Sequence, residues 1–270
     1  MKYLIVNIDD VGLSDAINQA VKKCYLSGAI TGVSIMPLAK NFQEACTLLH
    51  DLKKTEVGVH LSFVNQKEKG KFLGYQHIFL KFHILKKMSS QDIYNELRGQ
   101  IIKVKEAGLV ITHLDSHEYI HMFPMVLRIV IRLMKEYDIP YLRFPSEQSH
   151  LIKKKFRSVD LFRYVALKTF VRNAKSLIKS SCIQHNDHYL GHFHAGRIDD
   201  EILSFMIQGL TEGITELVVH PGVDTPELVI DSPWHHQAPR ELRTLLGHDW
   251  RRLLHAQNVQ LISHKEAVAI

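Results

Sequence analysis

Cysteine is scarce in this chain: its 270 residues include only Cys24, Cys46 and Cys182. Three scattered cysteines, none of them in a Cys-x-x-Cys pair, are too few for a disulfide framework, so we expect a reducing cytoplasm. Long apolar runs are also missing, because no stretch approaches the roughly 18 residues of a membrane-spanning helix. The N-terminus lacks the longer apolar region and the small-residue cleavage site of a signal peptide. The sequence therefore predicts a cytoplasmic protein without a transmembrane segment.

Acidic residues are nearly absent from one segment of the chain. The excess of Lys and Arg that gives the formal net charge of +6 is localised in this segment. Residues 153–179 contain a single acid, Asp160, and interspersed apolar residues that predict a basic amphipathic helix. Two interpretations stay open: a helix with a solvated basic face, or transient contact with an anionic membrane surface or a lipid-linked substrate. Regular aromatic interleaving is missing, so we expect no nucleic-acid partner. The nine cations are Lys153, Lys154, Lys155, Arg157, Arg163, Lys168, Arg172, Lys175 and Lys179.

Apolar runs typical of strands alternate with segments typical of helices, without low-complexity linkers, so we expect one domain over residues 1–270. An irregular stretch at 65–87 is long enough to be a lid or a substrate loop. The alternation predicts a parallel α/β sheet, either closed as a barrel or open and doubly wound. We expect strands at 3–8, 30–36, 57–60, 110–114, 140–144, near Cys182, 217–220 and 259–262, and helices at 14–26, 41–52, 91–106, 125–137, 199–210 and 239–256.

Chemically active side chains recur at the C-terminal ends of these expected strands. Asp9 and Asp10 end the first strand, and His60 ends a later one. Parallel α/β folds assemble their active sites at this edge, and a barrel brings every strand end around one mouth. Because the candidates lie on nonadjacent strands, a distorted (β/α) barrel similar to a TIM barrel is the favoured fold.

The adjacent acids at the end of the first strand can divide two tasks. Successive side chains of a strand point in different directions, so Asp10 can bind a metal while Asp9 stays free to accept a proton from water. The alternative is that one of them caps the turn at Val11 and Gly12. The pair alone does not decide between these interpretations.

The densest group of imidazoles lies between His113 and His121. His117 and His121 are four residues apart, but Pro124 indicates that a helix starts only after them, so we expect both on a loop. We interpret His117 as a metal ligand and His121 as lining the substrate cleft. Asp115 is expected to accept a hydrogen bond from an imidazole and orient it. A histidine in the position of His60, taken alone, is more often a structural residue than a metal ligand.

A site of one carboxylate and two imidazoles leaves coordination positions for water and substrate, which suits hydrolysis. His220, followed by Pro221 and Gly222, is placed to protonate a leaving amine or to stabilise a tetrahedral intermediate. The alternative interpretation is that His220, Pro221 and Gly222 form a turn with only a structural role. Arg143 can orient a carboxylate, bind substrate or form an ordinary ion pair.

Four ordered motifs of this chain resemble those of the YdjC-like carbohydrate deacetylases, from Asp9 to about Leu245. The resemblance implies a distorted barrel, one divalent metal usually taken to be magnesium, and removal of the acetyl group from an N-acetylated amino sugar. It implies Asp10, His60 and His117 as ligands, Asp9 as base and His220 as acid. The motifs are Asn7-Ile8-Asp9-Asp10-Val11-Gly12-Leu13-Ser14, Val57-Gly58-Val59-His60-Leu61, Thr112-His113-Leu114-Asp115-Ser116-His117 and His220-Pro221-Gly222.

One position departs from the family pattern: Tyr119 stands where members often have a further histidine, which puts substrate contacts in doubt. The segment 191–197 resembles a less regular family segment near the sugar, and we expect His194 to contact substrate. A Gly-bounded loop is the alternative for that segment. Two imidazoles suit zinc or another transition metal better than magnesium, so the metal stays open.

The sequence predicts a metal-dependent deacetylase of an N-acetylated amino sugar, which is free, polymeric or lipid-linked. One alternative is metal-dependent phosphoester hydrolysis, since the same ligand types serve it. The other is a metal- or sugar-binding protein without activity. A homo-oligomer is compatible with the sequence.

Overall fold

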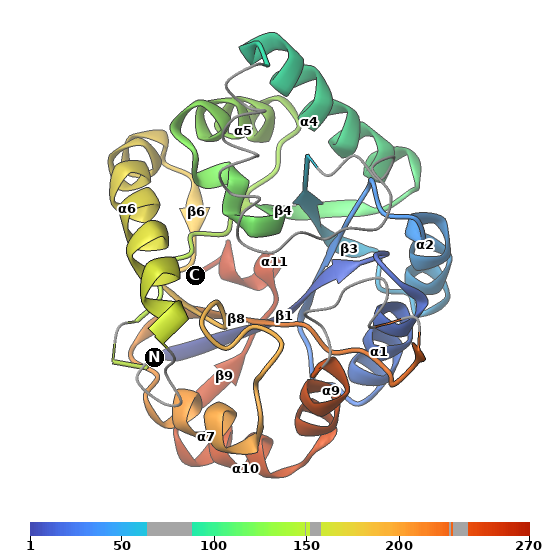
Figure 1. Cartoon of the computed structure of the whole chain (residues 1–270), viewed down its shortest axis with the longest axis vertical. Coiled ribbons are helices and arrows are strands. Elements are labelled where there is room, and N and C mark those ends of the chain that lie inside the picture. Colours follow the sequence, from blue (N-terminus) through green and yellow to red (C-terminus); the bar gives the residue numbers. More distant parts are fainter. Residues whose placement is uncertain (64–87, 149, 152–157, 227, 229–236) are drawn as a thin grey trace.

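In the described part of the computed structural model, nine strands pair in parallel in one curled sheet (Figure 1). The structure describes residues 1–270 except 64–87, 149, 152–157, 227 and 229–236. Along the sheet the order is β6-β5-β4-β3-β2-β1-β8-β7, and β9 pairs with β1. The elements are β1 (Lys2–Val11), α1 (Asp15–Leu26), β2 (Gly32–Ile35), α2 (Phe42–Asp51), β3 (Glu56–Leu61), α4 (Ser90–Glu106), β4 (Val110–Ser116), η1 (His117–Met122), α5 (Pro124–Glu136), β5 (Tyr141–Leu142), α6 (Ser158–Ser181), β6 (Gln184–His185), β7 (His188–Leu190), α7 (Asp200–Gln208), β8 (Gly213–Val219), α9 (Ala238–Leu246), α10 (Asp249–Ala256), β9 (Val259–Leu261) and α11 (His264–Ala267).

The two ends of the sheet meet, which makes the fold a distorted barrel as predicted. Strands β6 and β7 pair with opposite ends of the sheet, yet only Asn186 and Asp187 separate them in the chain. The Tyr189 N–H donates to the Ser146 carbonyl at 3.2 Å, and Tyr189 forms a parallel bridge with Glu147. The sheet is therefore curled until β7 reaches the segment that follows β5.

Helix boundaries follow from local signals that the sequence carries. The Ser14 side chain caps α1 by accepting the Ile17 N–H at 3.3 Å. Gly28 follows the helix with a φ of +68°. Glycine adopts this left-handed conformation without steric strain because it has no side chain. Pro124 occupies the first turn of α5, where its missing N–H leaves no bond unmade. These signals set the directions of the helices that pack around the sheet.

Apolar side chains fill the space between sheet and helices, whereas the interior of the barrel is largely polar. The main cluster includes Val6 and Ile8 of β1, both fully buried. A small separate cluster joins Ile5 and Tyr141 to Ile262 and Ala267 near the C-terminus. In Figure 1 the short helix α11 lies inside the ring of strands. The interior of the barrel near the C-terminal ends of the strands is thus occupied by polar residues.

Some element boundaries differ from the expected ones. The expected helical region at 239–256 consists of two helices, α9 and α10, which separate at Gly247. The strand expected near Cys182 is the pair β6 and β7.

The expected lid at 65–87 lies outside the described residues. Of the basic segment at 153–179, residues 153–157 lie outside them too, and the rest belongs to α6. Among the described residues, none of the helices combines the length and apolarity needed to cross a bilayer.

Candidate active site

Three predicted ligands converge at the mouth of the barrel from three different elements. Asp10 ends β1, His60 lies on β3, and His117 begins η1. Asp10 Oδ1 lies 3.3 Å from His60 Nε2 and 3.0 Å from His117 Nδ1. All three side chains are buried, and their nearest ligand atoms lie within 4.8 Å of one another. The structure therefore gathers one carboxylate oxygen and two imidazole nitrogens around one point.

The backbone of β1 turns sharply to point the two acids apart. Asp10 has a φ of 60°, a left-handed conformation that is uncommon outside glycine but more frequent for aspartate. The register of β1 against β2 shifts between Ile8 and Val11, where the strand is irregular. Asp10 consequently faces the imidazoles, while Asp9 faces Arg143.

His60 is held by a carboxylate on its far side. Its Nδ1 lies 2.8 Å from Asp115 Oδ1, which directs Nε2 toward Asp10. Burial lowers the pKa of His60, but Asp115 and Asp9 outweigh that effect and raise the pKa to about 10. A carboxylate behind an imidazole is the arrangement by which metal proteins orient a histidine ligand. The donor set fits a divalent metal on the chemistry of its residues, and the ion would take the place of the proton on His60.

A second geometric group, Asp9, His60 and Asp115, fits a cation less well. Arg143 contacts both of its carboxylates, with Nη1 2.7 Å from Asp9 Oδ2 and Nη2 2.6 Å from Asp115 Oδ2. A metal held by this group would lie beside a guanidinium cation. The group that contains Asp10 is therefore the better candidate.

Asp9 is fixed as a carboxylate beside the cluster. Arg143 donates to both of its oxygens, at 2.7 and 2.8 Å, and Asn7 Nδ2 donates to Oδ1 at 2.8 Å. Burial raises the pKa of Asp9, but Arg143 and, to a lesser extent, His60 and His220 lower it, and the net shift is downward. The side chain is thus ionised at neutral pH and can accept a proton.

Arg143 is the hub of a buried charge centre that we define as Arg143 with Asp9, Asp115 and Glu216. The guanidinium is fully buried, and its Nε donates to Glu216 Oε1 at 2.7 Å. Of the expected roles for Arg143, orientation of a carboxylate is the one that this geometry supports. Sequence reasoning missed Glu216, because it lies in the middle of β8 and only strand order brings it opposite Arg143.

Two further polar residues were missed. Asn7 Nδ2 donates to Ser34 Oγ at 2.8 Å, and Ser34 Oγ donates to Asp115 Oδ2 at 2.6 Å. Asn7 could have been found, since it precedes Asp9 by two positions on an apolar strand and must share its face. Ser34 carries no comparable signal. Together they complete the hydrogen bonding of the two carboxylates.

His220 lies at the end of β8, and a buried glutamate holds its backbone. The His220 N–H donates to Glu241 Oε2 at 2.7 Å, and the Ile198 N–H donates to Oε1 at 3.0 Å. Burial raises the pKa of Glu241 to about 7 against the opposing effect of these N–H groups. Glu241, on α9, therefore connects the loop of His220 to the loop that contains His194. Sequence reasoning missed this role.

The remaining predicted residues are placed less directly. His121 was expected to line the cleft but is fully buried: its Nδ1 bonds to Ser116 Oγ and its Nε2 lies 3.1 Å from the Arg143 carbonyl. Burial lowers its pKa to about 4. His194 is buried as well, on the loop after β7. The position of His121 supports the loop carrying Arg143 rather than a substrate wall.

Tyr119 forms part of the wall beside His117. Its hydroxyl lies 2.9 Å from the Tyr189 hydroxyl and 3.2 Å from His192 Nδ1. Both Glu118 and Tyr119 have positive φ angles, 54° and 57°, which reverse the chain directly after His117. The tyrosine therefore connects the mouth near His117 with the loop after β7.

The family model described as "YdjC-like protein" matches residues 3–256 of this chain. The chain belongs to the YdjC-like family. A protein of Thermoanaerobacter pseudethanolicus named carbohydrate deacetylase is 27% identical over 275 residues, which cover 98% of each chain. A protein of the same name from Brevibacillus brevis is 25% identical and covers 97% of this chain and 98% of its own length.

A crystal structure from Enterococcus faecalis V583 shares the fold of this YdjC-like chain. The two superpose with a TM-score of 0.73 at 21% identity, and 98% of each chain is covered. At this identity the likeness establishes the architecture. The curled parallel sheet is thus found in an independently determined structure.

Proposed function

We propose that this chain is a metal-dependent deacetylase that hydrolyses the acetamide of an N-acetylated amino sugar to the free amine and acetate. The observation that carries the proposal is the convergence of Asp10, His60 and His117 beside an Asp9 carboxylate fixed by Arg143. The names of its curated relatives support an activity on carbohydrates. N-acetylglucosamine-type oligosaccharides or glycolipids are the proposed substrates.

Asp10, His60 and His117 would hold the metal. A divalent ion bound there supplies Lewis-acid polarisation of the acetamide carbonyl and lowers the pKa of a bound water. The family resemblance points to magnesium, whereas two imidazoles and one carboxylate suit zinc or another transition metal better. We propose that one divalent ion binds, and that it is a transition metal because of this donor set.

Two side chains handle the protons of the reaction. Asp9 accepts a proton from the attacking water, because its lowered pKa keeps it ionised at neutral pH. Arg143 holds the carboxylate in one orientation with two parallel hydrogen bonds. His220, whose charge helps to lower the pKa of Asp9, is proposed to donate a proton to the departing nitrogen. The C–N bond of the acetamide then breaks to give acetate and the amino sugar.

Other proposed features rest on placement alone. His194, on the loop after β7, and Tyr119, in η1, are proposed to contact the sugar, since both lie at the mouth of the barrel. Cys24 and Cys46 are buried free thiols, which is compatible with the proposed cytoplasmic location. A homo-oligomer and peripheral membrane contact through residues 153–179 also remain proposals.

The direct test is acetate release from a panel of N-acetylglucosamine compounds that includes soluble oligomers, a glycolipid and, for comparison, sugar phosphates. Metal-stripped protein is reconstituted with magnesium, zinc, cobalt or manganese. We expect metal-dependent acetate release that disappears in His60→Ala and persists in His50→Ala, an exposed histidine of α2. Phosphate release without acetate would replace the proposal by phosphoester hydrolysis. Neither product would leave a binding protein.

A further inference from the structure

Two buried imidazoles lie stacked inside the barrel, and the proposed reaction uses neither of them. His113 belongs to β4 and His264 begins α11. Their ring centroids lie 3.4 Å apart with an angle of 11° between the ring planes. Both side chains are no more than 2% exposed. Because a polar group is costly to bury without partners, the contacts of this pair indicate what it does.

Two glycines make the space for these rings. A Cβ on Gly58 of β3 would lie 2.1 Å from His113 Nε2. A Cβ on Gly32 of β2 would lie 2.8 Å from His264 Cε1 and 2.5 Å from Asn7 Oδ1. Non-bonded carbon atoms normally pack at about 3.5–4.0 Å, so a side chain at either position would displace a ring. Strands β2 and β3 therefore carry glycine where the stacked pair requires it.

The segment around α11 holds His264 inside the barrel. The Ile262 N–H donates to the Leu4 carbonyl of β1 at 3.0 Å, two residues before His264. Ser263 and Glu266 form a capping box that fixes the start of the helix. Apolar side chains on both sides of His264 join the small cluster inside the ring of strands, where Figure 1 shows α11. The position of the imidazole is thus set by backbone pairing, capping and packing.

His264 contacts the buried charge centre through Glu216. Its Nε2 lies 3.5 Å from Glu216 Oε1, the oxygen that also accepts the Nε–H of Arg143. Burial raises the pKa of Glu216, but Arg143 and His264 lower it, and the net shift is downward. Within the residues that the structure describes, Glu216 Oε2 has no hydrogen-bond partner. Without His264, the Glu216 carboxylate would therefore keep only the guanidinium as a partner among these residues.

The stacked partner connects His264 to the other side of the same centre. His113 Nε2 lies 3.1 Å from Ser34 Oγ, and Ser34 Oγ donates to Asp115 Oδ2 at 2.6 Å. Burial and the neighbouring His264 hold the pKa of His113 well below its usual value, so this imidazole is neutral at neutral pH. The pair thus lies between Glu216 and Asp115, which both contact the buried guanidinium.

We propose that His264 is a positioning residue that acts through Glu216 and Arg143 on the carboxylate of the proposed base. The inference rests on the proposed deacetylase function and adds a residue of α11 to it. The guanidinium is a rigid, planar fork, so a carboxylate held at Nε constrains the direction of the two N–H groups that bond to Asp9. His264 supports that carboxylate on the side of the C-terminal helix.

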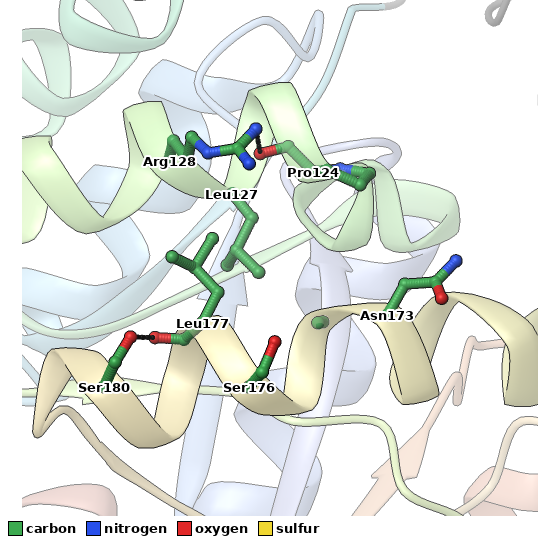
Figure 2. A pocket seen from close by; sticks show the side chains of 8 residues that line it. Pro124, Leu127, Arg128, Asn173, Ser176, Leu177 and Ser180 are labelled. Carbon is green, nitrogen blue, oxygen red and sulfur yellow. Dashed lines mark hydrogen bonds between the residues drawn. The ribbon is translucent and has the colours of Figure 1, made fainter.

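The outside of the barrel offers a control region. Figure 2 shows a cavity of about 280 Å³ between α5 and α6. Two polar side chains there bond to carbonyls of their own helices: Arg128 Nη1 donates to Pro124 at 3.4 Å, and the Ser180 hydroxyl donates to Leu177 at 2.9 Å. The Leu127 and Leu177 side chains extend between the two helices. Leu177→Ala therefore removes apolar packing between two outer helices.

The first experiment measures kcat and KM for acetate release by the metal-loaded protein. His264→Leu keeps an apolar bulk but has no N–H, and we expect kcat to fall about tenfold, the order of one lost contact to a charged group, with KM changed less than about twofold. His264→Gln retains an N–H donor and should recover most of kcat. His255→Leu, at an exposed histidine of α10, and Leu177→Ala should keep the wild-type kcat. A wild-type kcat in His264→Leu, or equal losses in His264→Leu and His264→Gln, would overturn the proposal.

The second experiment tests the route by combining His264→Leu with Glu216→Gln. If His264 acts through Glu216, its removal has little further effect once the carboxylate is gone. We expect kcat of the double variant to lie within about twofold of kcat of Glu216→Gln alone. Losses that multiply would show that the two residues act independently and would contradict the route. Glu216→Asp, which retracts the carboxylate, replaces Glu216→Gln if the amide variant does not fold.

The third measurement does not depend on turnover. Urea unfolding gives the shift in midpoint that His264→Leu causes in the wild type and in the Glu216→Gln background. We expect a smaller shift in the Glu216→Gln background, because the contact is already lost there. Equal shifts would contradict the contact. If no sugar releases acetate, the proposed function fails while this comparison still decides whether His264 holds Glu216.

Discussion

The buried charge centre and the exposed cations of α6, which are Lys168, Arg172, Lys175 and Lys179, differ in their exposure to solvent. Arg143 is fully buried and contacts three carboxylates at 2.6–2.7 Å, so the protein supplies every counter-charge itself. The α6 cations are exposed, and no acid occurs in the sequence between Asp160 and Asp187. The first arrangement fixes a geometry before any ligand arrives. The second leaves its cations in contact with solvent.

The difference has an energetic consequence. Removing one partner from a buried ionic group leaves an uncompensated charge and costs about 3–5 kcal/mol. An exposed ion pair contributes about 0–1 kcal/mol. Changes in the charge centre should therefore act on folding as well as on catalysis, whereas changes in the exposed α6 cations should alter the free energy of unfolding by about 1 kcal/mol or less.

The largest effect is expected for Arg143→Met. It leaves Asp9, Asp115 and Glu216 buried without their cation, and we expect the free energy of unfolding to fall by about 3–5 kcal/mol. The control is Arg98→Met, because Arg98 is exposed and pairs with Glu136 at 3.3 Å. The control should lose about 1 kcal/mol or less. Urea unfolding of both variants measures the two values, and equal losses would remove the distinction between the two regions.

Asp9→Asn is expected to separate catalysis from metal binding. An amide cannot accept the proton, so acetate release should fall at least a hundredfold, on the order of a lost general base. Bound metal, measured by elemental analysis, should stay near the wild-type amount because Asp10 supplies the carboxylate ligand. Asp15→Asn, at an exposed acid of α1, is the matched control. Normal turnover in Asp9→Asn would refute its role as base.

Glu241→Gln tests whether a buried acid outside the charge centre holds the His220 loop. The amide replaces one acceptor oxygen by a donor, so either the His220 or the Ile198 N–H loses its partner. We expect unfolding to become easier by about 1–3 kcal/mol. A decrease in kcat with little change in KM would show that His220 is displaced. Unchanged stability and kcat would argue against this connection.

The same variant predicts a difference in pH dependence. The pKa of Glu241 is raised from 4.5 to about 7 in the folded protein. Between these values the folded protein holds a proton that the unfolded chain releases, so this group's contribution to stability is present below pH 4.5 and lost as pH rises to about 7. Unfolding from pH 4.5 to 7.5 should show this loss in the wild type and not in Glu241→Gln. Parallel curves would contradict the raised pKa.

The smallest effect is a slope in metal affinity. The pKa of His60 is raised to about 10, so the metal-free protein carries a proton on this residue at neutral pH. Metal binding displaces that proton, and the affinity for zinc should rise about tenfold per pH unit between pH 7 and 9. Competition with a chelator of known pH dependence measures the slope. An affinity independent of pH would mean that His60 is not a ligand or is already neutral.

Much of the site was predictable because strand ends share an edge in parallel folds. Asp10, His60 and His117 could be grouped without knowing which strands are neighbours, since all ends of a barrel meet at one mouth. Glu216 could not be found this way, because its contact with Arg143 depends on strand order and on the depth of each residue in the barrel.

Other features depend on details that a sequence pattern does not encode. The burial of His121 follows from a chain reversal at Glu118 and Tyr119, two residues with positive φ angles and no glycine to signal them. The role of Glu241 depends on the packing of α9 against two loops. The division of the expected helical region at 239–256 into two helices at Gly247 was not predicted. Local pattern therefore grouped Asp10, His60 and His117, which the structure brings together, but it did not find the residues that support them.

The most direct measurement of the central claim is a titration of metal-free protein with zinc, followed by acetate release from an N-acetylglucosamine oligomer. The account predicts that activity rises to a plateau at one equivalent of metal in the wild type and in His150→Ala, a control at an exposed histidine. His117→Ala should show neither the binding step nor the activity. Acetate release without metal, or undiminished release by His117→Ala, would contradict the assignment of the site.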